Sequence, residues 1–291
     1  MESLLERLQV LVPGASRRTL KQMLEHGRIQ VNGKEVRRGS EPLPEKAKVI
    51  ILPKAATIAE PPVPILLEDD HLIVAVKPAG MLSVSTREAA RESLWSSLRK
   101  MLRVRGKGEK IHLVHRLDEA ASGILVFAKS EMAKKTLKAL FEKHGVDRRY
   151  AALVEGRMVA QKGTFKSRLV EMDEPRHRVR SVADRDPVSV QAKARLATTN
   201  YTVLSYAKGL TAVEVRTESG RKHQIRVHFA EAGHPVAGDT LYGAARGPRL
   251  FLHAWVLGFA HPVTRAPLRF VAKPGREFSE RFRDVFERVR D

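Results

Sequence analysis

Apolar and polar positions follow a helical period near the start of the chain. Leu20 and Leu24 lie one turn apart, and polar residues occupy most of the positions around them. Ser16 precedes this segment and Gly27 follows it, and these residue types are typical of the start and the end of a helix. The pattern predicts a helix over residues 17–26.

Short apolar runs separated by turn residues follow this helix. Residues 29–31 alternate as a strand does, Asn32-Gly33 is a strong hairpin signal, and residues 49–52 predict another strand. We therefore expect residues 1–53 to form a small α-β domain. The following stretch has three prolines near its end and few large side chains, which predicts a linker over residues 54–64.

Beyond residue 64 the apolar runs are mostly short, like strands. Strands are predicted over residues 65–67, 72–76, 151–154, 190–196, 202–206, 212–215, 250–259 and 268–271. A helix is predicted from Ser130, as its N-cap, through His144, with Gly145 ending it. Many strands with few crossover helices predict an α+β fold, in which residues 65–291 form one domain around a large mixed, mostly antiparallel sheet.

Charge and composition narrow the function. The formal net charge is +20 and the isoelectric point is near 10.5, which favours an anionic partner, with nucleic acid as the leading candidate. The chain has no cysteine, so disulfides, thiolate zinc sites and cysteine nucleophiles are excluded. No apolar run is long enough to span a bilayer and the N-terminus does not resemble a secretory signal. We expect a cytoplasmic monomer without a membrane partner.

A charged cluster, His115-Arg116-Leu117-Asp118, lies between two apolar runs. A carboxylate drawn into a cleft there requires a cation or hydrogen-bond donors. The small residues that follow, 120–123, would then leave room for a flat ligand. The same residues also fit a surface turn in which Asp118 pairs with Arg116. The residues alone leave both interpretations open.

Other chemistries have weaker support. Two groups, one of His112, His115 and Asp118 and one of His223, His228 and His234, suggest a metal site. Side chains alternate faces along a strand, however, so a spacing of three does not converge on one ion, and no HExxH pattern is present. A phosphate-binding P-loop and a G-x-S-x-G elbow are also absent.

Two further segments carry polar and aromatic residues. They are RRYAALVEG, residues 148–156, and ESGRKHQIRVHFAEAGHPVAGDTLYG, residues 218–243, in which we expect a basic helix after Gly220. A carboxylate, a tyrosine and an arginine from these segments could assemble around a base removed from its stack. The candidate RNA-binding residues are Arg17, Arg18, Lys21 and Arg28 in the small domain and Arg116, Arg221, Lys222 and His223 in the large one.

These segments carry a specific resemblance. HRLDEAASG, RRYAALVEG and SGRKHQIRVHFAEAGHPVAGDTLYG resemble the signature motifs of the RluA family of RNA pseudouridine synthases. EDDHLIVAVKPAG before them and LFLHAWVLGFAHPVT after them match the family in the same order, so the resemblance covers about residues 65–274. SRRTLKQMLEHGRIQVNGKEV resembles the small RNA-binding domain named after ribosomal protein S-four.

The resemblance implies roles for individual residues. Asp118 matches the nucleophile that attacks uridine, and Arg226 matches the arginine that keeps this carboxylate ionised. Tyr150 matches the tyrosine that stacks on the base, and Arg116 matches an arginine that enters the RNA near the extruded base. The implied reaction needs neither a metal nor an organic cofactor. Ala121 departs from the family, which usually has threonine there.

The implied activity is isomerisation of specific uridines to pseudouridine, with large-subunit ribosomal RNA as the favoured substrate and transfer RNA as the alternative. The first competing hypothesis, from a different class, is an RNA-binding or ribosome-assembly factor without catalysis. The second is a metal-dependent RNA hydrolase, whose activity a chelator would abolish.

Overall fold

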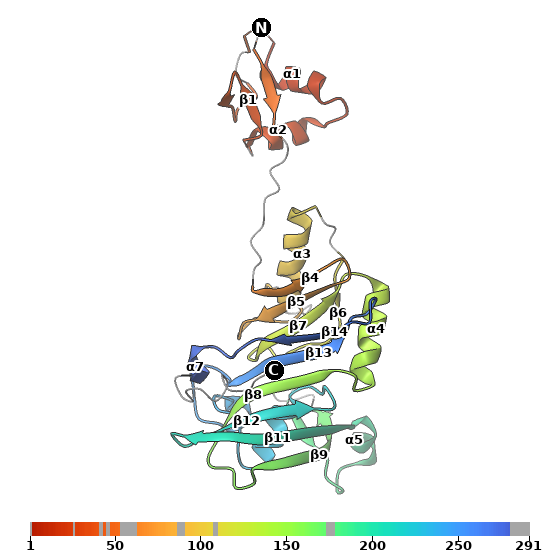
Figure 1. Cartoon of the computed structure of the whole chain (residues 1–291), viewed down its shortest axis with the longest axis vertical. Helices are drawn as coiled ribbons and strands as arrows, with labels where there is room; N and C mark the ends of the chain where they lie inside the picture. Colours follow the sequence, from red (N-terminus) through yellow and green to blue (C-terminus); the bar gives the residue numbers. More distant parts are fainter. Residues whose placement is uncertain are drawn as a thin grey trace. The chain divides into compact units, whose positions relative to one another are not determined.

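The computed structural model describes residues 2–25, 27–40, 43–44, 47–52, 63–85, 91–106, 110–172 and 178–279. The chain divides into two compact units, Met1–Ala59 and Glu60–Asp291, called here the N-terminal unit and the C-terminal unit (Figure 1). Apart from its last two residues, the linker predicted over 54–64 lies outside the described residues. No helix within the described ranges is both long and apolar enough to cross a membrane.

The N-terminal unit packs two helices against a three-stranded antiparallel sheet. The helices are α1 (Leu4–Leu11) and α2 (Arg17–Glu25), and the sheet has the order β2 (Lys34–Glu35), β1 (Ile29–Val31), β3 (Val49–Ile51). Its core contains Leu4, Leu8, Leu20, Leu24 and Ile29. The predicted apolar face of α2, formed by Leu20 and Leu24, is therefore confirmed.

Local sequence signals account for most of this unit. Ser16 Oγ accepts a hydrogen bond from Thr19 N at 3.2 Å, as an N-cap does. Asn32 and Gly33 have φ of 51° and 81°, the two positive values that a tight hairpin turn of this type requires. The end predicted for α2, residue 26, lies outside the described residues. Helix α1 was not predicted, although Ser3 and Glu6 form a complete capping box at its start.

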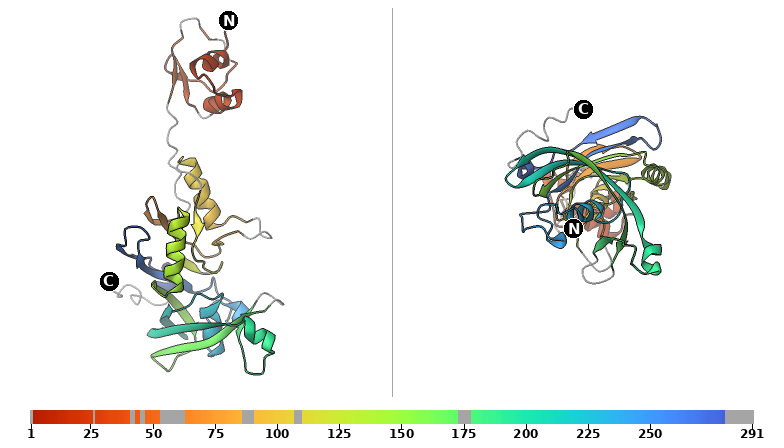
Figure 2. Two further views of the ribbon diagram at one scale, coloured as in Figure 1. Left: turned by 90° about the vertical axis from the view of Figure 1, so that its right-hand side faces the viewer. Right: turned by 90° about the horizontal axis from the view of Figure 1, so that it is seen from below.

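The C-terminal unit is built on one large sheet, whose long strands curve when seen from below (Figure 2). Its order is β10 (Val179–Ser181), β9 (Lys162–Glu171), β11 (Arg195–Ala207), β12 (Leu210–Thr217), β8 (Asp147–Glu155), β13 (Leu252–Ala260), β7 (Ser122–Ala128), β5 (Leu72–Lys77), β4 (Ile65–Glu68). β14 (Pro267–Val271) pairs with β13, and β6 (His112–Leu113) pairs with β7. Among the strand pairs of the described residues only β7–β13 is parallel, so the predicted mixed, mostly antiparallel sheet is confirmed.

The helices of this unit are α3 (Leu94–Val104), α4 (Glu131–Glu142), α5 (Val188–Lys193), α6 (Gln224–Glu231), the 3-10 helix η1 (Thr240–Tyr242) and α7 (Arg276–Ser279). Helix α4 starts after Ser130, whose Oγ accepts from Ala133 N at 3.1 Å, as predicted. Helix α3 was not predicted. The expected basic helix after Gly220 differs in detail, because Arg221 and Lys222 precede α6 and most of α6 is buried.

The strand predicted over residues 190–196 is wrong. The amides of Val190 and Gln191 both donate to the carbonyl of Pro187, at 2.9 and 3.0 Å, and this starts the short helix α5. The strand β11 begins only at Arg195. A short apolar run has no period that separates a strand from a helical turn, and here the turn after Pro187 determines the outcome.

The parallel contact between β7 and β13 explains the small residues after Asp118. Gly123 has φ of +123°, and a Cβ there would lie 2.2 Å from the carbonyl oxygen of Ala254 on β13. Ser122 is buried, with its hydroxyl 2.7 Å from Nδ1 of His253. Residues 122 and 123 are therefore small because two strands approach closely, and not to make room for a ligand. Ala121 does line the cleft described next.

Candidate active site

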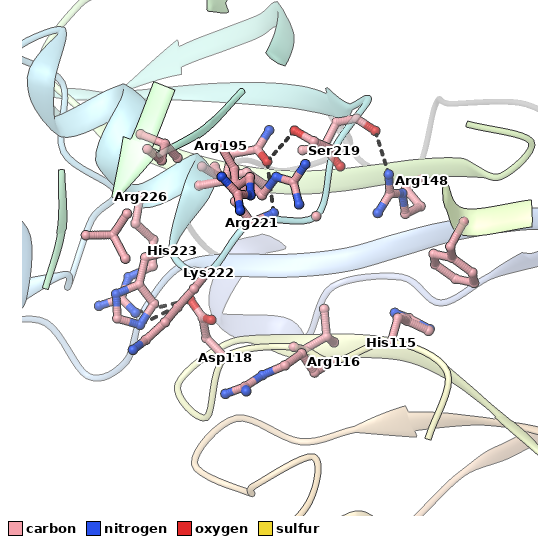
Figure 3. Close-up of a pocket in the computed structure, with 18 of the residues that line it drawn as sticks. His115, Arg116, Asp118, Arg148, Arg195, Ser219, Arg221, Lys222, His223 and Arg226 are labelled. Carbon is pink, nitrogen blue, oxygen red and sulfur yellow. Dashed lines mark hydrogen bonds and ion pairs between the residues drawn. The ribbon is translucent and has the colours of Figure 1, made fainter. Parts of the chain in front are cut away.

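A cleft of about 1010 Å³ in the C-terminal unit brings the predicted catalytic residues together (Figure 3). Asp118, Tyr150 and Arg226 all line it. The predicted RNA-binding residues Arg116, Arg221, Lys222 and His223 line it as well. The other four RNA-binding candidates, Arg17, Arg18, Lys21 and Arg28, belong to the N-terminal unit.

Asp118 lies in the irregular segment between β6 and β7, and several buried groups fix this segment. Ser83 Oγ donates to the carbonyl of Leu117 at 2.8 Å and accepts from its amide at 3.1 Å. The strand expected before Asp118, on which the case against a metal site rests in part, covers only His112–Leu113, and the chain continues to Asp118 as a loop. The neighbouring acid, Glu119, pairs with Arg91 at 2.8 Å.

Lys77, at the end of β5, also holds this segment in place. Its fully buried ammonium lies within hydrogen-bond distance of four carbonyl oxygens, at 3.0 Å from Pro78, 2.7 Å from Met81, 3.0 Å from Glu119 and 2.5 Å from Ala121. Burial lowers the pKa of Lys77 to about 8, while the charges of Asp118 and Glu119 raise it. The lysine thus fixes the backbone on both sides of the turn after Asp118.

Asp118 faces an arginine that a second carboxylate orients. Nη1 of Arg226 donates to Oδ2 of Asp118 at 3.1 Å, and Nε and Nη2 of Arg226 bind both oxygens of Asp239 at 2.6 and 2.8 Å. The side chain of Asp239 is 1% exposed, that of Arg226 8% and that of Asp118 19%. Solvent therefore hardly reaches Asp239 and Arg226, and Asp118 is the most accessible of the three. Burial lowers the pKa of Arg226, but Asp239 and then Asp118 raise it above its ordinary value.

This geometry decides between the two interpretations of Asp118. The carboxylate lies half-buried in a cleft and pairs with Arg226 across 108 residues of sequence. Arg116 is exposed, and no hydrogen bond or ion pair joins it to another described residue. The surface pair of Asp118 with Arg116 is therefore absent from the described part of the structure.

Tyr150 reaches the cleft from β8 and packs against the apolar cluster that contains Ala121. Burial raises the pKa of the Tyr150 hydroxyl, the charge of Arg148 lowers it, and Asp118 raises it further. The net direction is upward, so the ring is a neutral phenol at neutral pH. A neutral aromatic ring beside a carboxylate presents a surface on which a base can stack.

Arg148 and His115 line the cleft on the side away from Arg226 and His223 (Figure 3). Arg148 donates to the carbonyl oxygens of Thr217 and Glu218 at 3.3 and 3.0 Å and so joins β8 to the segment before α6. His115 stacks on Phe141 with 4.5 Å between ring centroids and accepts from Val126 N at 3.2 Å. These two contacts hold the ring of His115 against α4 and β7, so it supports the loop that carries Asp118.

The basic candidates of this unit have different surroundings. Lys222 pairs with Glu171 at 2.8 Å, and Nε of Arg221 donates to the carbonyl of Leu196 at 3.2 Å. His223 lies deeper, with its Nε2 3.9 Å from Oδ2 of Asp118 and its Nδ1 2.9 Å from the hydroxyl of Tyr242. Within the described ranges no group of three or more His, Cys, Asp and Glu residues could hold a metal ion.

Sequence reasoning missed three residues of this arrangement: Asp239, Tyr242 and Lys77. Asp239 and Tyr242 belong to the quoted segment GDTLYG, but nothing in their spacing indicates that they reach Arg226 and His223. Lys77 had a usable signal, because a lysine ends the apolar run LIVAVK, whose side chains are mostly buried. A charged residue within such a run requires several hydrogen-bond partners.

Family models match both units of the chain. Residues 71–231 match the family described as RNA pseudouridylate synthase, and residues 6–49 match the S4 domain. The chain is 35% identical over 226 residues to "Uncharacterized RNA pseudouridine synthase YjbO" of Bacillus subtilis, covering 77% of each protein. It is 35% identical over 219 residues to "Dual-specificity RNA pseudouridine synthase RluA" of Escherichia coli, covering 73% of this chain and 94% of that one.

One further relative aligns with a longer part of the chain, which includes residues of both units. The chain is 32% identical over 286 residues to "Ribosomal large subunit pseudouridine synthase D" of Xylella fastidiosa, covering 91% of this chain and 83% of that protein. Among solved structures, "Human RNA Pseudouridylate Synthase Domain Containing 4" superposes with a TM-score of 0.60 at 25% identity, over 74% of this chain and 89% of the human chain. This TM-score indicates that the two chains share a fold over the aligned part. The chain therefore belongs to the RluA family of RNA pseudouridine synthases and carries an S4 domain in front of the catalytic one.

Proposed function

We propose that Asp118 is the nucleophile of this pseudouridine synthase and that large-subunit ribosomal RNA is its substrate. In this proposal Arg226 pairs with the carboxylate and orients it, and Tyr150 stacks on the uracil. The observation that carries the proposal is the 3.1 Å contact of Asp118 with Arg226, at the accessible end of a buried Asp–Arg–Asp arrangement in the cleft. A carboxylate that is accessible and paired with a fixed guanidinium is placed as a nucleophile has to be.

The reaction breaks one bond and forms another within the same nucleotide. Asp118 attacks the uridine, and the bond between N1 of uracil and C1′ of ribose breaks. The uracil turns in the site, C5 bonds to C1′, and the bond from Asp118 to the nucleotide breaks, which returns the free carboxylate. The C5 proton leaves and N1 gains a proton. Atoms balance without an oxidant, a reductant or a second substrate. A uridine must leave its stack to reach a carboxylate in a cleft, so base flipping precedes the chemistry.

The two units have separate roles in this proposal. Residues 65–291 carry out catalysis, residues 1–53 add phosphate contacts, and residues 54–64 link them. Arg17, Arg18 and Lys21 are exposed on α2, where basic side chains can bind phosphates. Arg28 has a partly structural role, because its Nε donates to the carbonyl of Leu52 at 3.2 Å.

Ribosomal RNA is favoured by the extent of the matches. The ribosomal enzyme of Xylella aligns with 91% of this chain, which extends into the N-terminal unit, whereas the dual-specificity enzyme of Escherichia coli aligns with 73%. Transfer RNA is the alternative substrate, because the dual-specificity relative is 35% identical in its aligned part, against 32% for the Xylella protein. Mapping pseudouridines in RNA from cells with and without the gene distinguishes the two substrates.

The test of the nucleophile is Asp118→Asn, which keeps the shape of the side chain and removes its charge. Tritium release from C5 of uridine is measured with ribosomal and transfer RNA in EDTA and without added cofactor. We expect activity in the unmodified protein and background in the variant, with unchanged RNA affinity, because phosphate contacts dominate binding. The matched control is Glu119→Gln, since Glu119 is adjacent but pairs with Arg91 outside the cleft.

Wild-type turnover in Asp118→Asn would show that the nucleophile is another group. Activity abolished by EDTA would favour a metal-dependent enzyme instead. A protein that binds ribosomal particles and is inactive on every RNA would favour the assembly-factor hypothesis.

A further inference from the structure

His223 occupies a position that its sequence context did not indicate. It is the N-cap residue of α6 and has a positive φ of 52°, a conformation in which histidine and asparagine are enriched among non-glycine residues. Its side chain is 15% exposed and points into the cleft toward Asp118 (Figure 3). A residue grouped with the surface RNA contacts thus lies beside the reacting carboxylate.

Tyr242 fixes the tautomer of this histidine. The Tyr242 hydroxyl accepts from Val179 N at 2.9 Å and lies 2.9 Å from Nδ1 of His223. Of the described residues, His223 is the one acceptor within reach of the phenolic proton. The hydroxyl therefore donates to Nδ1, which leaves the ring proton of the neutral imidazole on Nε2.

The proton on Nε2 faces Asp118. Nε2 of His223 lies 3.9 Å from Oδ2, the same oxygen that accepts from Nη1 of Arg226 at 3.1 Å. The other oxygen of Asp118, Oδ1, has no hydrogen-bond partner within the described part of the chain. Arg226 Nη1 and His223 Nε2 therefore both face Oδ2 of Asp118, and Oδ1 remains available to a ligand in the cleft.

One short segment holds both donors. Asp239 binds Arg226 through both of its oxygens, and three residues later Tyr242 binds His223 from η1. The Tyr242 ring also lies against Arg226, with 5.1 Å from the guanidinium carbon to the ring centroid. The two groups that face Asp118 are thus oriented by neighbouring side chains of one turn.

We propose that His223 is a positioning residue for the nucleophile: held by Tyr242, its Nε2–H donates to Oδ2 of Asp118 when RNA fills the cleft and directs Oδ1 at the uridine. The inference rests on the proposed role of Asp118. A distance of 3.9 Å is longer than a hydrogen bond, and catalytic hydrogen bonds are often long before substrate binds and shorten in the complex.

The charges around His223 give this arrangement a pH dependence. The groups that face it are Asp118 from the loop, Arg226 from α6, Lys222 from the preceding turn, and Asp239 and Tyr242 from the segment at η1. Burial lowers the pKa of His223, Asp118 raises it, and Arg226 and Lys222 lower it, with a net shift below 6.5. Protonated His223 would form a full ion pair with Asp118 and reduce the nucleophilicity of the carboxylate, so the rate falls as pH falls through this pKa.

Two substitutions of His223 distinguish the role of Nδ1 from the role of Nε2. In His223→Asn the side-chain amide lies where Nδ1 of the histidine lies, so Tyr242 keeps a hydrogen-bond partner. Asparagine also tolerates the positive φ of this position. The variant lacks the donor that Nε2 provides to Asp118. His223→Gln places its amide near the position of Nε2 and cannot titrate. The matched control is His71→Asn, because the ring of His71 packs edge-on against His261 and does not line the cleft.

Single-turnover rates of tritium release are measured from pH 5 to 8 at saturating enzyme, together with RNA affinity and the melting temperature. We expect His223→Asn to slow the reaction about 10- to 100-fold, the scale of one hydrogen bond to a charged group. RNA affinity stays unchanged. His223→Gln recovers part of the rate and lacks the step below pH 6.5 that the unmodified protein shows, and His71→Asn matches the unmodified protein.

Tyr242→Phe tests the orientation independently of His223. It keeps the ring against Arg226 and removes the hydroxyl, so we expect a slower single-turnover rate in the otherwise unmodified protein and no further loss in the His223→Asn background. An equal loss in both backgrounds would show that Tyr242 does not act through His223.

The inference is overturned if His223→Asn weakens RNA binding and leaves the single-turnover rate unchanged, because His223 is then an RNA contact. It is also overturned if the pH step persists in His223→Gln. These outcomes leave the proposed function intact as long as Asp118→Asn is inactive. Activity in Asp118→Asn would instead show that Asp118 is not the nucleophile, which is the part of the proposed function on which this inference rests.

Discussion

Asp239 binds Arg226 through two parallel hydrogen bonds, of 2.6 and 2.8 Å, and leaves Nη1 of the guanidinium for Asp118. The planar guanidinium makes this geometry specific, because both ends of one rigid group are occupied by carboxylates. Asp239 is almost fully buried and Asp118 is not. The buried carboxylate therefore orients the arginine, and the accessible one remains available for chemistry.

Asp239→Asn should separate orientation from chemistry. The variant leaves a buried guanidinium without its main counter-charge, so we expect the free energy of unfolding to fall by about 3 kcal/mol, the lower end for a broken buried pair because Asp118 remains. We expect the single-turnover rate to fall about 10- to 100-fold, as is typical when an orienting partner is lost. Thermal melting and tritium release measure the two effects.

The control for this variant is Asp186→Asn. Asp186 also binds an arginine with both oxygens, at 2.6 and 2.7 Å from Arg180, but lies outside the cleft. Arg180 is 36% exposed, so solvent screens this pair and we expect a much smaller change in stability than in Asp239→Asn, with normal activity. A full rate in Asp239→Asn would show that Asp239 does not orient the site.

Local signals in the sequence predict the local structure well. Asn32-Gly33 and Ser130 predict a hairpin turn and a helix start that both occur, because one or two residues contain the whole cause. The run over 190–196 fails because the deciding contact is made by Pro187, which lies outside the run. The start of α1 was within reach of the sequence, since Ser3 and Glu6 have capping-box spacing.

The candidate site shows the same difference between residues that local sequence identifies and residues that only the fold brings into contact. Asp118, Tyr150 and Arg226 were found through motifs, and the cleft brings them together. Asp239 and Lys77 act through partners that the fold brings to them, such as the carbonyl oxygen of Ala121, which lies 44 residues from Lys77 in the sequence. No spacing rule contains such contacts, because they depend on which strands become neighbours in the sheet.

His115 should make the stability of the protein fall in acid. Burial, followed by the charge of Arg148, lowers the pKa of His115 from 6.5 to about 3. Between these values the unfolded chain binds more protons than the folded one, so the free energy of unfolding decreases as pH drops from 6.5 toward 3. His115→Gln keeps an acceptor for Val126 N without the titration. Melting temperatures between pH 7.5 and 4.5 should then decline less steeply in the variant.

Part of the acid dependence should remain in that variant. His253 is buried and its pKa is lowered to about 4, chiefly by burial, so it contributes in the same direction. Parallel melting curves for His115→Gln and the unmodified protein across this range would show that His115 is not buried in its neutral form.

The basic face of α2 should control the salt dependence of RNA binding. Arg17, Arg18 and Lys21 are exposed and border a shallow hollow of about 430 Å³. If they bind phosphates, Arg18→Gln with Lys21→Gln weakens binding on every RNA sequence and reduces the slope of log K against log salt by about 2, one for each contact. Filter binding at several salt concentrations measures the slope.

The matched control on the same unit is Arg7→Gln. Arg7 pairs with Glu2 at 2.6 Å, so its charge is already compensated, and we expect the salt slope to stay unchanged. Equal slopes for the unmodified protein and the Arg18 and Lys21 double variant would remove the phosphate contacts that we assign to α2.

Arg116 should matter most where the uridine is paired. It lies two residues before Asp118, lines the cleft and is exposed, so its guanidinium is free to enter the space that a flipped nucleotide vacates. Flipping costs a few kcal/mol in a duplex and least for an unpaired base. We therefore expect Arg116→Ala to slow single-turnover pseudouridine formation more on a target uridine in a stem than on the same uridine in a flexible loop.

Arg116→Lys keeps the charge but not the planar group, and we expect it to restore RNA affinity more than the rate on the stem. A loss of the same size on stem and loop would mean that Arg116 contacts the RNA without helping the base to leave its stack.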